Sequence, residues 1–235
     1  MDACSMGGIT VEGSIFLSAS VPDPKRNPEF AETSNPVAIT SAVRALVHVT
    51  LGRRVLIWGG HPAITPMIKV VAEEMDLDYG KWVKLYQSRF FEDQFPQDNK
   101  RFKNIIYTEN IENNVNQSLH HMRKRMFSEN NFNAAVFIGG MAGIIDEFNL
   151  FKQLQPGKDM IPVLSTGGAT LKVAEKIKSE LGDDLRTDLD YVRLFHRKLG
   201  ISERENRFPS PDTQPKELEQ RFWTPNQMRD GSVIG

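Results

Sequence analysis

Glu147 and Arg123 are the residues whose types and spacing best suit chemistry on a small molecule. Glu147 follows a Gly139-Gly140 pair at the predicted start of a helix, where its carboxylate could face a cleft. A phosphate would repel this carboxylate, so its natural partners are sugar hydroxyls, an amine, or a cation developing at an anomeric carbon. The alternative interpretation is an acid that the helix dipole favours, and this is also our interpretation of Asp146.

Arg123 directly follows Met122, which belongs to the apolar stripe of another predicted helix. Its side chain could therefore run along the edge of the core and reach the same cleft. An arginine there would bind a phosphate bidentately or orient a base. However, Arg123, Lys124 and Arg125 form a run of positive charge, and such a run more often marks a solvated helix face.

Small residues follow four of the predicted strands and indicate a place for an anion. Glycine lets a phosphate approach the main chain, and the next helix presents free amides to it. A single Gly-Gly pair is explained as well by ordinary turn chemistry, whereas three pairs at equivalent ends of one sheet favour a ligand. The candidate ligand-binding residues in these loops are Ser18, Ser20, Gly59, Gly60, Gly139, Gly140, Met141, Gly143, Thr166, Gly167 and Gly168.

The five histidines show no metal-ligand spacing, so we predict no metal, and we predict no cofactor. His61, directly after Gly60, is the histidine best placed to touch a ligand, although it could equally fill a loop. The Gly-x-Ser-x-Gly elbow, the Gly-x-Gly-x-x-Gly pattern and the Walker motif are all absent from the sequence. These absences argue against serine hydrolase, NAD-dependent redox and P-loop NTPase activity.

The composition is that of an ordinary globular protein. The 235 residues include 29 Lys and Arg against 30 Asp and Glu, which leaves no global charge to attract nucleic acid or an anionic membrane. The longest apolar runs are far below the roughly 20 residues needed to cross a bilayer. With no secretory signal and with Cys4 as the single cysteine, the sequence predicts a soluble, cytoplasmic protein.

Short strand-like runs alternate with amphipathic helix patterns, and this alternation must position the candidate residues. Crossovers of this kind predict an α/β, Rossmann-like, three-layer αβα fold with a mostly parallel central sheet. Ligands of such sheets bind beyond the carboxyl ends of the strands, where the strand order reverses. The predicted strands are 14–20, 54–58, 82–87, 104–108, 134–138 and 160–164. Helices are predicted over 36–51, from 65 onward, around 115–126, over 144–154 and over 169–181, with a polar, proline-rich loop over 22–36 and a charged and aromatic loop over 90–101.

The chain is expected to form one domain with two terminal arms. We assign residues 1–13 to an N-terminal arm, 14–200 to the domain and 201–235 to a proline-rich C-terminal arm. The C-terminal arm is expected to lie on the domain or on a second subunit, and the alternative is a dedicated recognition segment. We also expect a homodimer or a larger homo-oligomer.

The residues named above resemble the signature of LOG-type phosphoribohydrolases. That family pairs Arg-Lys on a helix with a Pro-Gly-Gly-x-Gly-Thr-x-x-Glu loop, and here Arg123-Lys124 is followed by Gly139-Gly140 and Glu147. The stretch 14–181 is similar to the wider SLOG superfamily, closest to the group called SLOG cluster 3. The sequence departs from the LOG pattern in three ways: Ile138 replaces the proline, the loop is one residue longer, and Ile144 replaces the threonine.

The resemblance implies two functions. LOG enzymes cleave the N-glycosidic bond of nucleoside 5′-monophosphates, and on that analogy Arg123 and Glu147 are catalytic while the glycines hold the phosphate. Other SLOG domains bind nucleotides or ADP-ribose-type signals without turnover, often in antiviral defence. Because of the departures above, we favour a nucleotide-derived ligand that is bound or sensed over one that is hydrolysed. An interaction module with a vestigial pocket is the third alternative.

Overall fold

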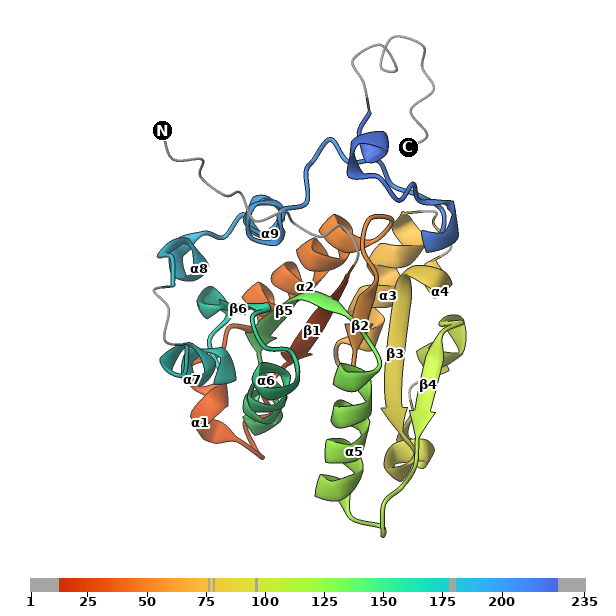
Figure 1. Ribbon diagram of the computed structural model, residues 1–235. Helices are drawn as coiled ribbons and strands as arrows, with labels where there is room; N and C mark the ends of the chain where they lie inside the picture. The colour runs from red at the N-terminus through yellow and green to blue at the C-terminus, as the bar shows by residue number, and fades with distance from the viewer. Residues whose placement is uncertain (1–12, 76, 78, 96, 178–180, 224–235) are drawn as a thin grey trace.

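The computed structural model describes residues 13–75, 77, 79–95, 97–177 and 181–223. Cys4, nearly all of the expected N-terminal arm and the last twelve residues of the expected C-terminal arm lie outside this part of the chain. Within it, strands and helices alternate as the periodicity predicts (Figure 1).

A six-stranded, all-parallel sheet forms the centre of the described structure, with the strand order β4-β3-β2-β1-β5-β6. The strands are β1 (Ser14–Ser20), β2 (Leu56–Trp58), β3 (Val83–Ser88), β4 (Ile105–Thr108), β5 (Phe132–Gly139) and β6 (Asp159–Val163). The chain moves outward from β1 to β4 on one side and from β5 to β6 on the other. The loops that leave β1 and β5 therefore diverge, and this is the place where an open parallel sheet binds ligands.

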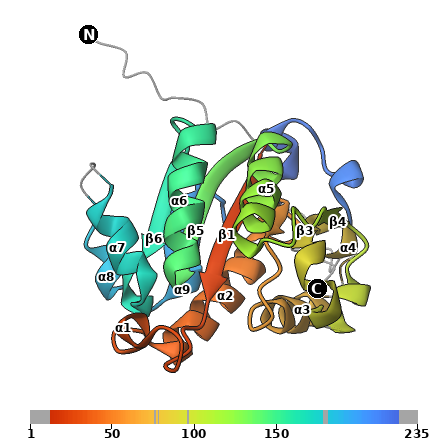
Figure 2. The same cartoon turned by 90° about the horizontal axis from the view of Figure 1, so that it is seen from below.

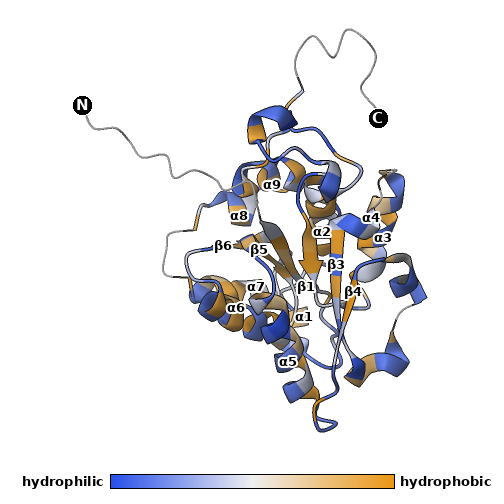
Figure 3. Cartoon of the chain, turned by 45° about the vertical axis from the view of Figure 1, so that its right-hand side comes forward, coloured by the Kyte–Doolittle hydropathy of each residue, from blue (hydrophilic) through white to orange (hydrophobic). Residues whose placement is uncertain are grey.

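Helices cover both faces of the sheet, which confirms the predicted three-layer fold (Figure 2). On one face lie α2 (Pro36–Thr50), α3 (Thr65–Glu74) and α9 (Tyr191–Leu199), and on the other lie α5 (Val115–Ser128), α6 (Ala142–Leu154) and α7 (Ala169–Glu175). Successive side chains of β1 alternate between the two cores: Ile15 and Leu17 face α2, and Phe16 faces α6. Figure 3 shows the resulting apolar interior beneath helices with hydrophilic outer faces.

Several boundaries differ from those expected. The helix expected over 169–181 ends at Glu175, and the expected loop over 90–101 contains two 3₁₀ helices, η1 (Arg89–Gln94) and η2 (Gln97–Arg101). Four further short helices surround the sheet: α1 (Pro28–Ala31), α4 (Tyr79–Trp82), α8 (Asp184–Thr187) and η3 (Leu164–Thr166). The helix α9 was not predicted, although Asp190 caps its start and Gly200 ends it in the left-handed region.

An aromatic contact fixes the position of α6 along β5 of the sheet. Phe148 is buried, and its ring lies edge-on to Phe137 of β5 with 5.6 Å between the ring centroids. Edge-to-face pairs of this kind stabilise packing beyond the apolar area that they bury. Because Phe148 directly follows Glu147, this packing also sets where the Glu147 carboxylate lies.

Residues 201–223 pack against the amino-terminal edge of the sheet, opposite the ends that carry the candidate site (Figure 1). Glu205 is buried there, and its carboxylate accepts two hydrogen bonds from Arg54 at 2.6 and 3.1 Å. Arg53 donates to the Glu205 carbonyl at 2.7 Å, and the Trp82 indole donates to the Phe208 carbonyl at 2.8 Å. The segment also contains η4 (Pro211–Thr213) and η5 (Leu218–Arg221).

The Arg54–Glu205 ion pair gives a test of this packing. In Glu205→Gln the Arg54 charge stays buried without its counter-ion, so we expect the free energy of unfolding to fall by about 3 kcal/mol or more. Urea denaturation followed by circular dichroism measures the loss. Glu219→Gln, at an exposed position of the same segment, is the control and should change stability by less than about 0.5 kcal/mol. Equal stability of the two variants would contradict the assigned role of Glu205.

Candidate functional site

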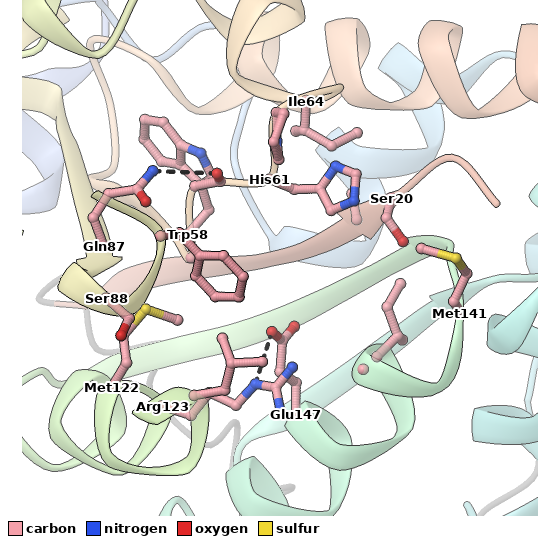
Figure 4. A pocket seen from close by; sticks show the side chains of 18 of the residues that line it. Ser20, Trp58, His61, Ile64, Gln87, Ser88, Met122, Arg123, Met141 and Glu147 are labelled. Carbon is pink, nitrogen blue, oxygen red and sulfur yellow. Dashed lines mark hydrogen bonds and ion pairs between the residues drawn. The ribbon is translucent and has the colours of Figure 1, made fainter. Parts of the chain in front are cut away.

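A cavity of about 510 Å³ opens at the carboxyl edge of the sheet (Figure 4). Its walls come from the ends of β1, β2 and β3, from η1, from the inner face of α5 and from the first two turns of α6. The volume lies within the range typical of small-molecule sites. The strand order places this cavity beside the point where the loops after β1 and β5 diverge.

Glu147 and Arg123 meet on the wall of this cavity. The Arg123 guanidinium donates from Nε to Glu147 Oε1 at 3.2 Å, and both side chains are mostly buried, at 11% and 15% exposure. The Ser18 hydroxyl donates to Glu147 Oε2 at 2.5 Å. Three elements, β1, α5 and α6, thus supply one polar cluster, which we call the Ser18–Arg123–Glu147 cluster. Both neighbours of the Glu147 carboxylate are donors.

Asp146 occupies a different environment from its neighbour. Its side chain is 67% exposed and lies 3.6 Å from Arg123 Nη1, outside the cavity wall. Glu147 is therefore the carboxylate that faces the cavity, and Asp146 contributes only a solvent-screened charge at the outer end of Arg123.

The start of α6 brings main-chain amides to the cavity. Gly139 and Gly140 have φ values of +60° and +82°, which only glycine adopts freely, and a Cβ at Gly140 would lie 1.9 Å from Ile144 Cδ1. This turn directs Met141, Ala142 and Gly143 into the cavity wall, and no side chain caps the helix. A helix start of this kind offers free N–H groups to an anion.

His61 lies on the opposite wall, with its ring directed into the cavity (Figure 4). Its Nδ1 accepts a hydrogen bond from the Ala63 amide at 3.2 Å. Burial lowers the pKa of His61, and the positive charge of Arg26 lowers it further. The ring is thus favoured in its neutral form with the hydrogen on Nε2, where it can donate to a ligand.

Sequence reasoning missed the end of the cavity formed by β3 and η1. Flat and apolar side chains gather there, and two polar residues, Gln87 and Ser88, close it. The apolar members are Trp58, Phe91, Phe95, Leu119 and Met122. Gln87 and Ser88 end β3, so their position at a strand end was a usable signal. Arg26 was also missed, because nothing in the polar loop after β1 distinguishes it.

The corner at Thr166, Gly167 and Gly168 lies outside the cavity wall, although we expected it to bind the ligand. The Thr166 hydroxyl accepts the Gly139 amide at 2.8 Å, and the Gly140 carbonyl accepts the amide of Ala169 at 2.9 Å. A Cβ at Gly167 would lie 1.8 Å from the Thr33 carbonyl oxygen, so the main chain of residue 33 fills the place expected for an anion.

Gly139, Gly140 and Ser18 also lie behind the cavity wall. The two glycines shape the turn before α6, and Ser18 acts through Glu147. The structure brings together at the wall the predicted residues Ser20, Gly59, Gly60, His61, Arg123, Met141, Gly143 and Glu147. A Cβ at Gly143 would lie 3.0 Å from Arg123 Nη2. Because Gly143 has no side chain, the Arg123 guanidinium can lie against the first turn of α6.

The described residues hold neither a cluster of metal-ligating side chains nor a helix that could span a membrane. No three His, Cys, Asp or Glu side chains among them lie close enough together to hold a metal ion. None of the helices in that part of the chain combines the length and the apolar character required to cross a bilayer.

Comparison with known proteins gives one family. A model described as the SLOG cluster3 family matches residues 29–199, which is most of the chain. An X-ray structure of TM1055, a target of the Northeast Structural Genomics Consortium, is similar over 79% of this chain and 99% of its own, with 14% identity and a TM-score of 0.46. A search of curated proteins found no match.

The lowered pKa of His61 predicts a pH dependence of stability. Because the unfolded chain binds the proton at the ordinary pKa of 6.5 and the folded chain binds it less readily, the free energy of unfolding should fall as the pH drops below about 6.5. Urea denaturation at pH 7.5 and pH 5.0 measures the fall. His61→Asn should reduce it, whereas His120→Asn, at an exposed position, should leave it unchanged. A fall of the same size in both variants would contradict the prediction.

Proposed function

The chain belongs to the SLOG cluster3 family, and on that premise we propose that its cavity binds a nucleotide or a nucleotide-derived ligand. The observation that carries this proposal is the Ser18–Arg123–Glu147 cluster, which lies between the amide-rich start of α6 and the apolar end of the cavity. The phosphate, the sugar and the base of a nucleotide match these three parts of the cavity in the same order.

The start of α6 suits the phosphate. The threonine hydroxyl of the LOG pattern is replaced by Ile144, which is buried, so main-chain amides remain as donors at this turn. Arg26 adds a positive charge at the rim, and it makes no ion pair or side-chain hydrogen bond with any described residue. A guanidinium and free amides on the wall of one cavity favour an anion.

Glu147 suits the sugar. Its carboxylate lines the cavity, and sugar hydroxyls are natural donors to it. Gly59 opposite has no side chain, and a Cβ there would lie 3.9 Å from Glu147 Oε1 and 3.2 Å from Met122 Cε. The absence of a side chain at Gly59 keeps this part of the cavity open.

The apolar end suits a base. Phe91 and Phe95 offer aromatic surfaces, and stacking on such surfaces contributes roughly 1–3 kcal/mol per base in nucleic-acid complexes. From β5, which leads into α6, to β3 the cavity crosses three interstrand spacings, or about 14 Å. This span accommodates an extended nucleoside monophosphate.

Hydrolysis of the N-glycosidic bond is the second candidate function, and the placement of Glu147 favours it. In this reaction the bond between the anomeric carbon and the base breaks, the base leaves with the electron pair and takes up a proton, and water supplies the new hydroxyl. The Glu147 carboxylate would stabilise the positive charge that develops on the sugar, and Arg123 would orient Glu147 and the substrate.

A panel of nucleoside monophosphates, NAD and ADP-ribose distinguishes the two functions. We expect at least one compound to raise the melting temperature, because a ligand at a hundred times its Kd adds about 2.7 kcal/mol of stability. Release of free base, measured by chromatography, would show that the chain is a hydrolase. The Glu147→Gln variant should then release base about a hundredfold more slowly, or slower still. Asp146→Asn is the matched control and should keep the wild-type rate. If no compound raises the melting temperature and none releases free base, the proposal is contradicted.

Arg26 gives a separate test of the phosphate end. In Arg26→Gln the Kd of a bound nucleoside 5′-phosphate should rise about fivefold at low salt, and the difference should shrink as salt screens the charge. The Kd of the unphosphorylated nucleoside should not change. Lys25→Gln removes a neighbouring exposed cation that lies outside the cavity wall and serves as the control. An equal loss for both forms of the ligand would contradict a phosphate at this end.

A further inference from the structure

Gln87 closes the apolar end of the cavity, and its amide is held in one orientation. The side chain is 4% exposed and lies on the cavity wall beside Trp58 (Figure 4). Its Nε2 donates to the Gly60 carbonyl at 3.2 Å. Turning the amide over would place Oε1 against that carbonyl, and two acceptors facing each other repel. With the amide held in this orientation, Oε1 is the acceptor that Gln87 can offer a ligand.

The position of Gly60 strengthens this constraint. Gly60 has a φ of +71°, and a Cβ there would lie 1.9 Å from Gln87 Nε2. Only glycine therefore lets the Gln87 amide come this close to the main chain after β2. The hydrogen bond from Nε2 to Gly60 is the one that the Gln87 side chain makes with the described residues, so Oε1 is available to a ligand.

We infer that Gln87 Oε1 accepts a hydrogen bond from an exocyclic amino group of the bound base, and so selects bases that carry one. This inference rests on the proposed nucleotide site and specifies its ligand. A ring carbonyl at the same place would face Oε1 with a second acceptor, and a C–H would leave Oε1 buried without a donor. Both cost binding energy, because a buried acceptor without a partner loses its hydrogen bond to water.

Adenine and guanine both carry such an amino group, at position 6 and position 2 of the ring. Two matched pairs of ligands test the two positions one at a time. AMP and purine riboside 5′-monophosphate differ only in the 6-amino group, and GMP and IMP differ only in the 2-amino group. Isothermal titration calorimetry gives Kd for all four. In the wild-type chain we expect the amino-bearing member of one pair to bind about tenfold more tightly.

Gln87→Met keeps the length of the side chain and removes the acceptor, so the tenfold ratio should fall to about one. The ratio is a better readout than either Kd, because a general loosening of the cavity would weaken both members of a pair alike. Gln155→Met is the matched control: Gln155 also donates its amide to main-chain carbonyls, those of Phe127 and Asn130, but lies outside the cavity wall. That variant should keep the wild-type ratio.

Each result decides the matter. A ratio that is lost in Gln87→Met and kept in Gln155→Met supports the inference. Equal binding within both pairs in the wild-type chain overturns it while leaving a nucleotide site in place, and this result does not depend on whether a variant folds. A preference that survives in Gln87→Met also overturns it. If none of the four compounds binds, the nucleotide site proposed for these ligands fails and the inference fails with it.

Discussion

The divergence of the chain at β1 and β5 is the constraint on which the rest of the site depends. Because β1 leads outward to β2 and β5 leads outward to β6, the loops that leave them cannot cover each other. Ser18 of β1 can therefore donate a hydrogen bond to Glu147 of α6, and Arg123 of α5 donates a second one to the same carboxylate. The cavity extends from this cluster toward β3, along strands that follow one another outward in the sheet.

The Ser18–Arg123–Glu147 cluster places a carboxylate on the wall of a mostly apolar cavity without leaving its charge unpaired. Burying an ionised carboxylate alone would be costly, whereas a guanidinium and a hydroxyl together supply the hydrogen bonds that it would otherwise lose. The α6 turn departs from the LOG pattern at Ile144, whose side chain packs against Gly140 instead of offering a hydroxyl. The chain thus has the arginine and the glutamate of the LOG pattern but lacks its threonine hydroxyl.

The packing of residues 201–223 and the candidate cavity lie at opposite edges of the sheet. The buried Arg54–Glu205 pair and the hydrogen bonds of Arg53 and Trp82 attach residues 201–223 to the amino-terminal edge. The carboxyl edge carries the cavity and is left uncovered by this segment (Figure 1). The packing that holds residues 201–223 in place therefore does not close the cavity.

The sequence by itself determined the layers and the order of the elements, because hydrophobic periodicity reports which face of each element is buried. It also indicated that Glu147 and Arg123 could approach one cleft, because Glu147 follows a strand end and Arg123 follows the apolar stripe residue Met122. Only the tertiary structure decided that residue 33 fills the corner at Gly167, that Arg26 reaches the rim, and that Gln87 is oriented by Gly60. These contacts join segments far apart in the chain, and their geometry is set by packing, which local periodicity does not encode.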